Sequence, residues 1–79
     1  MNASRRRTLA RVSSLIGEAY ALLSEVTEEE REALDNTPDS LQSSERYVHD
    51  DEKCYELEEA VSNLEDIQNT LDEICEGLA

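Results

Sequence analysis

The chain has 79 residues, so it forms one domain at most, and a domain this small buries only a little over half of its unfolded surface. Twenty acidic residues against seven lysines and arginines give a net charge of −13, which disfavours direct binding to nucleic acid or to an anionic membrane. Trp and Phe are absent, Gly occurs twice and Pro once, so the composition favours long uninterrupted helices.

The first residues are basic. Arg5, Arg6, Arg7 and Arg11 all precede the first acidic residue, Glu18. The apolar residues that follow are interrupted by polar and charged ones, so they form no signal-peptide core. No stretch approaches the ~20 consecutive apolar residues that a membrane-spanning helix requires. We therefore expect a cytoplasmic protein with no membrane partner.

A first helix is predicted over about residues 4–34, with Ser4 as its N-cap. Its apolar residues recur at steps of three and four, as in an a/d heptad, and Glu30 is the one interruption. They are Leu9, Val12, Ile16, Ala19, Leu23, Val26 and Ala33. Leu15 and Leu22 widen this stripe on one side, which indicates that the helix contacts two neighbours.

A turn is predicted over residues 35–42. Pro38 disfavours a helical conformation at Thr37, and Asp39 followed by Gln42 is typical of a capping box. Leu41 is the one large apolar residue in this connection, so we expect it to fold back onto the neighbouring helix ends.

A second helix is predicted over about residues 43–77, with Ser43 or Ser44 as its cap. Asp50 and Gln68 interrupt its heptad pattern. The apolar heptad positions are Tyr47, Cys54, Leu57, Val61, Leu64, Leu71, Cys75 and Leu78, and Ala60, Ile67 and Ile74 form a second row beside them. Cys54 and Cys75 are about 31 Å apart on one helix, which excludes a disulfide between them.

Two long helices joined by a short turn predict an all-α fold: an antiparallel two-helix hairpin that forms a single domain over residues 1–79. A lone hairpin would leave the second apolar rows uncovered. We therefore expect a homodimer, a four-helix bundle with Leu15, Leu22, Ile67 and Ile74 at the dimer interface.

The two helices are expected to align about Pro38, with Val26 opposite Cys54 and Glu30 near Asp50. Carboxylates that face each other across a seam repel unless Arg46 or Lys53 reaches between them. The sequence therefore predicts a local break, a bulge or a solvent-filled splay of the helices at residues 49–52.

No catalytic or metal-binding constellation is visible. His49, the single histidine, lies in the most charged stretch, and Glu45 stands four residues before it rather than at the Glu-x-x-His spacing of di-iron bundles. The run from Asp50 to Glu52 lacks the ligand spacing and glycine of a calcium loop, and no phosphate-binding glycine motif occurs. We expect no enzyme activity, catalytic residue, metal or cofactor.

The remaining chemistry is an acidic surface where the two helices meet the turn. Its candidate partner-binding residues are Glu28, Glu29, Glu32, Asp50, Asp51, Glu52, Glu56 and Glu59. Rows of carboxylates can approach the charge density of duplex DNA, one charge per ~1.7 Å of axis, so they fit a basic protein surface that otherwise holds nucleic acid. In the alternative interpretation the charge only keeps a structural, dimeric helical accessory protein soluble. A third possibility is a small ligand held between the helices.

The stretch from Glu28 to Tyr47 reads EEEREALDNTPDSLQSSERY, and the second helix then contains Leu57-Glu58-Glu59-Ala60. This combination resembles a group of small acidic helical-hairpin proteins of bacteriophages, prophages and mobile elements. The resemblance implies a role inside a bacterial host. By analogy with the small acidic phage proteins that resemble anti-CRISPR or anti-restriction DNA mimics, it implies an inhibitor of a host defence or nucleic-acid-binding complex.

Overall fold

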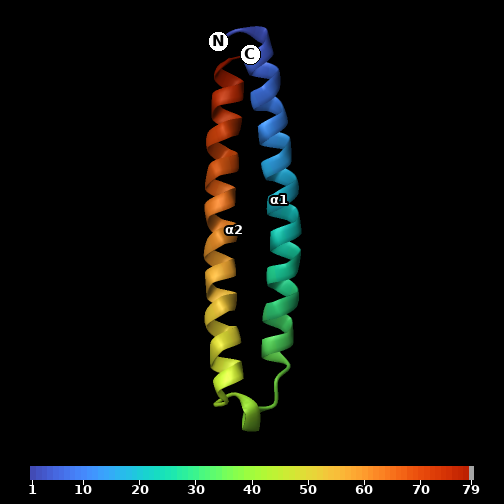
Figure 1. Ribbon diagram of the computed structural model, residues 1–79, viewed down its shortest axis with the longest axis vertical. Coiled ribbons are helices and arrows are strands. Elements are labelled where there is room, and N and C mark those ends of the chain that lie inside the picture. Colours follow the sequence, from blue (N-terminus) through green and yellow to red (C-terminus); the bar gives the residue numbers. More distant parts are fainter. Residues whose placement is uncertain (79) are drawn as a thin grey trace.

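The computed structural model describes residues 1–78, which form two long helices lying side by side (Figure 1). Helix α1 spans Ala3–Asp35, a 3-10 turn η1 spans Asp39–Leu41, and helix α2 spans Glu45–Gly77. The result is a rod of 59 × 14 × 14 Å with both chain ends at one tip, here called the open end, and η1 at the other, the closed end. The all-α hairpin predicted from the sequence is confirmed.

The helix bounds agree with the predicted ones within two residues, but one cap differs. Asn2, not Ser4, caps α1, because its Oδ1 accepts a hydrogen bond from the backbone N–H of Arg5 at 2.8 Å. Ser44 caps α2 as expected, with its Oγ accepting from the N–H of Tyr47 at 3.2 Å. Each cap satisfies one of the backbone donors that a helix start leaves without an intrahelical partner.

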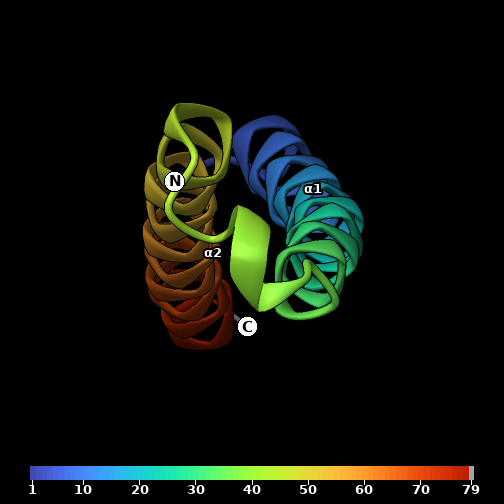
Figure 2. The ribbon, with the colours of Figure 1, turned by 90° about the horizontal axis from the view of Figure 1, so that it is seen from below.

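The turn lies across the closed end between the two helices (Figure 2). Gln42 Nε2 fixes its shape by donating to the carbonyl oxygen of Thr37 and to Oδ1 of Asp39, each at 3.2 Å. Leu41 lines a shallow hollow with Leu34 and Tyr47 but remains 54% exposed. The expected packing of Leu41 is therefore only partial.

The α2 side of the interhelical seam follows the predicted heptad. Its predicted seam residues, Asp50 and Gln68 included, are all buried or half-buried. Gln68 fits because it lies against Gly17: a Cβ added there would come within 3.3 Å of Gln68 Oε1. Its Nε2 donates to Ser13 Oγ at 2.9 Å and to Asp72 Oδ1 at 3.1 Å, so the amide forms a polar layer that fixes the register of the helices.

The α1 side differs from the prediction at every second position. The residues that are buried or half-buried at seam spacing are Leu9, Ser13, Ile16, Tyr20, Leu23, Thr27, Glu30 and Leu34. The predicted Val12, Ala19, Val26 and Ala33 each stand one residue earlier and are exposed. Ser13 and Thr27 are tolerated on the seam because their hydroxyls are bonded: Thr27 Oγ1 donates to the Leu23 carbonyl at 2.7 Å, and Ser13 Oγ to Asp72 at 3.0 Å.

The core is therefore small. Among residues 1–78 only Thr27, Leu34 and Cys54 are classed as buried. The break or bulge predicted at residues 49–52 is wrong, because α2 runs without interruption through them.

Candidate interaction surface

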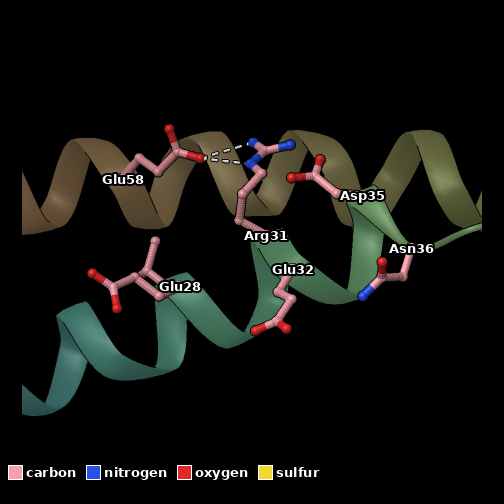
Figure 3. Close-up of a pocket in the computed structure, with 7 residues that line it drawn as sticks. Glu28, Arg31, Glu32, Asp35, Asn36 and Glu58 are labelled. Atoms are coloured by element: carbon pink, nitrogen blue, oxygen red, sulfur yellow. Dashed lines mark hydrogen bonds and ion pairs between the residues drawn. The ribbon is translucent and has the colours of Figure 1, made fainter.

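Arg31 joins the two helices near the closed end. Its Nη1 donates to Asp51 Oδ1 at 2.9 Å, and its Nη2 and Nε donate to Glu58 Oε1 at 2.8 and 3.0 Å. Figure 3 shows Arg31 of α1 reaching across to Glu58 of α2. The Tyr55 ring lies beneath the guanidinium, with Cζ 4.9 Å from the ring centroid, which is the geometry of a cation–π contact.

The repulsion that predicted the break does not arise, because the predicted register is wrong by about one helical turn. Ser13 bonds Asp72 and Gly17 lies against Gln68, so Glu30 lies near Cys54, and Asp50 lines a hollow with Leu34. Neither expected cation bridges the helices: Arg46 lies 4.0 Å from Asp50 on its own helix and Lys53 pairs with Glu56 at 3.0 Å, whereas Arg31 reaches from α1 to carboxylates of α2. Its hydrogen bonds to Asp51 and Glu58 raise the pKa of Arg31 further above its ordinary value, so it stays charged.

Cys54 lies next to this ion pair and is fully buried. Its Sγ is 3.6 Å from Glu58 Oε1. Burial raises the pKa of the Cys54 thiol, and this exceeds the lowering effect of Arg31. Because a nucleophilic cysteine needs the thiolate form, Cys54 is a packing residue.

Acidic doublets repeat every seven residues along α2. They are Asp51-Glu52, Glu58-Glu59, Glu65-Asp66 and Asp72-Glu73. We call these eight residues the α2 acidic rows. All are exposed except Asp51, which is half-buried. They span about 33 Å of helix axis, or one carboxylate per ~4 Å, close to the ~3.4 Å per charge of one DNA strand.

The first residue of each doublet flanks the seam beside α1. Asp51 and Glu58 bind Arg31, Asp72 accepts from Ser13, and Glu65 lines a hollow with Tyr20. The second residues point further from the seam into solvent, because consecutive helical residues differ by about 100°. The doublets thus form one acidic surface along about 33 Å of α2, and not at the closed end alone.

The structure divides the eight candidate partner-binding residues between different surfaces. Asp51, Glu52 and Glu59 belong to the α2 acidic rows. Glu28 and Glu32 line a hollow of α1 beside Arg31 and Glu58 (Figure 3), and Asp50 lies on the seam. Glu29 and Glu56, by heptad position, lie on the opposite side of the seam from Arg31. Glu65, Asp66, Asp72 and Glu73 were not among the predicted partner-binding residues, although the seven-residue spacing of the doublets is visible in the sequence.

Apart from carboxylates such as Glu29 and Glu56 near the closed end, the opposite side of the hairpin is apolar. Arg31 of α1 binds Asp51 and Glu58 of α2 on one flank of the seam. In an antiparallel pair, equivalent heptad positions of the two helices lie on the same flank, so the positions on the other flank of α1 and of α2 together form the second side of the hairpin. These residues, here called the apolar side, are Val12, Leu15, Ala19, Leu22 and Val26 of α1 and Ala60, Ile67 and Ile74 of α2. Leu22 is 64% exposed and Ile67 46%, so this side is uncovered in the single chain.

Among residues 1–78, no three His, Cys, Asp or Glu side chains are grouped so that they could hold a metal ion. Neither long helix, over the residues that the structure describes, has the length and hydropathy needed to cross a membrane.

The Arg31 contacts predict a salt-dependent loss of stability. Arg31→Met keeps most of the aliphatic chain but leaves Asp51 and Glu58 without their cation, so the midpoint of thermal unfolding should fall. Arg46→Met is the matched control, because the Arg46 side chain is 94% exposed and should contribute almost nothing. Circular dichroism melts at low and high salt check this. Equal midpoints for the two variants would contradict a structural role for Arg31.

No protein-family model, curated protein or solved structure that was compared with this chain matches it.

Proposed function

We propose that this protein is a non-enzymatic interaction module that presents the α2 acidic rows to a basic surface on another protein. That surface is one that otherwise binds nucleic acid, so the module acts as a nucleic-acid mimic. The observation that carries the proposal is the repeat of acidic doublets along α2, seven of whose eight residues are exposed, at about the charge spacing of one DNA strand.

Electrostatics gives such a module both speed and selectivity. A row of like charges attracts a basic partner over a distance of about 8 Å at physiological ionic strength, which accelerates encounter and makes binding sensitive to salt. The same charge repels nucleic acid and anionic membranes, so neither is a direct partner. Holding the carboxylates on one continuous helix keeps their spacing fixed before binding, which lowers the entropy that binding costs.

The resemblance of the segment from Glu28 to Tyr47 to small acidic phage proteins suggests the biological setting. In this proposal the partner is a defence complex or another nucleic-acid-binding complex of a bacterial host, and the protein acts as its inhibitor in the host cytoplasm. The proposal includes no catalytic residue, metal or cofactor.

We further propose that the hairpin forms a homodimer, a four-helix bundle that covers Leu15, Leu22, Ile67 and Ile74. The exposed area supports this. The chain exposes 5940 Å², whereas a folded monomer of 8.9 kDa is expected to expose about 4,800 Å². The excess of roughly 1,100 Å² is comparable to the ~800 Å² that each partner buries in a standard stable interface.

The small core and the uncovered apolar side also favour a second candidate. A structural accessory protein would dimerise through the same residues and would use its charge only for solubility. The two functions differ in what they require of the acidic rows. Mimicry requires their position on α2, whereas solubility requires only the net charge.

A competition experiment tests the mimicry. The protein is immobilised and exposed to lysate of a bacterial host at low and high salt, and each captured protein is assayed for nucleic-acid binding. We expect a basic nucleic-acid-binding protein that high salt releases and whose binding to DNA or RNA the free module competes. A captured protein whose nucleic-acid binding is unaffected, or no salt-dependent capture, would support the accessory function instead.

A further inference from the structure

On the apolar side of α1, the order of residue types is the same from either end. Its residues Val12, Leu15, Ala19, Leu22 and Val26 form a Val-Leu-Ala-Leu-Val series centred on Ala19. On α2, Ala60 and Ile74 lie at equal distances from Ile67. A two-fold axis that crosses a helix brings each residue against its mirror position on a second copy. Such an axis would place Leu near Leu and Val near Val on α1, and Ile74 against the small Ala60 on α2.

The two central residues, Ala19 of α1 and Ile67 of α2, lie at nearly the same height along the rod. Gly17 lies against Gln68, and Tyr20 lines a hollow with that same residue. Ala19 stands between Gly17 and Tyr20, and Ile67 is next to Gln68. One axis perpendicular to the rod can therefore pass near both Ala19 and Ile67.

The charge is unequally divided between the two ends. The closed half, residues 20–66, holds 16 acidic and three basic residues, a balance of −13. The remaining residues hold four acidic and four basic ones, a balance of zero. Two copies packed with their closed ends together would bring two halves of −13 side by side. Packed in opposite directions, each closed half lies beside a nearly neutral open half, and the repulsion is smaller.

We propose that the second copy packs antiparallel on the apolar side, with α1 against α1 and α2 against α2. The closed end of each hairpin then lies beside the open end of the other. This inference rests on the dimer in the proposed function and adds its geometry. It also assigns a role to the N-terminal arginines. Arg5 lies in the same heptad row as Val12. In the antiparallel dimer it comes within about one helical turn of Glu29 of the second copy.

Distances between the copies test this orientation. Ser40, exposed in the closed-end turn, is replaced by Cys and spin-labelled in a Cys75→Ser chain, where Cys54 is too buried to react. Pulsed electron paramagnetic resonance should give a label separation close to the 59 Å length of the rod. Closed ends packed together would instead give about 20 Å, two interhelical spacings.

A cross-link supplies a second, independent readout. Ala19→Cys should form a disulfide between copies on mild oxidation, because the axis passes beside residue 19. Ala33→Cys, in the same heptad row and also exposed, is the matched control and should not. A short Ser40 distance, an equal yield from both cysteines, or a monomer in solution would overturn the antiparallel dimer. All measurements use purified protein without a partner, so their failure leaves the mimicry proposal standing, and failure of mimicry leaves these distances unchanged.

Discussion

Replacing Ile67 with Asp is expected to convert the dimer into a monomer. In the proposed bundle Ile67 of one copy faces Ile67 of the other, so the substitution places two carboxylates together at the centre of an apolar interface. An uncompensated buried charge costs about 3–5 kcal/mol, and here it occurs twice per dimer. A hairpin with so few buried residues has little stability in reserve, so partial unfolding should accompany dissociation. Light scattering reports the mass, and circular dichroism reports the helicity.

Val48→Asp is the matched control for this substitution. Val48 is also on α2 and is 47% exposed, against 46% for Ile67, but its heptad position lies away from the apolar side. It should remain dimeric with a nearly unchanged melting temperature. If the two variants dissociate equally, or if the wild-type chain is a monomer at micromolar concentration, Ile67 does not lie at a dimer interface.

The sequence was sufficient to predict the hairpin and the α2 seam, because α2 has one stripe of apolar seam residues and a single clear phase. Helix α1 carries two stripes that differ by one residue at every second position. Hydropathy alone ranks Val12 and Val26 above Ser13 and Thr27, and it predicted the wrong set. The choice between the stripes depends on partners on the other helix, such as Asp72 for Ser13, which no single-helix pattern contains.

The sequence indicated that the candidate surface is acidic, but it did not indicate how the acidic residues are arranged on the helices. The acidic residues were counted by their nearness to the turn, whereas helical geometry groups them by their heptad phase. The role of Arg31 was missed for a different reason. A long side chain can bind carboxylates on another helix more than a turn apart, as Asp51 and Glu58 are, and heptad positions do not predict that reach.

Reversing part of the α2 acidic rows should abolish inhibition while leaving the fold intact. The variant carries Glu59→Lys, Asp66→Lys and Glu73→Lys, all at solvent-facing positions of α2. Lysine is as good a helix former as glutamate and better than aspartate, so helicity should be retained. Three reversed charges among the eight of the α2 acidic rows should weaken binding to a basic partner by more than about ten-fold. Binding is measured with the protein captured from host lysate, and inhibition is measured as phage-defence activity in cells.

The matched control separates position from net charge. Glu18→Lys, Glu25→Lys and Glu32→Lys lie at the equivalent solvent-facing positions of α1, and either triple variant changes the net charge from −13 to −7. Mimicry by α2 requires that the α1 variant keeps most of its binding while the α2 variant loses it. If both variants lose binding equally, only total charge matters and the α2 rows are not a specific surface. If both stay folded and inhibition is unchanged, or if the wild type inhibits nothing, the acidic residues serve solubility alone.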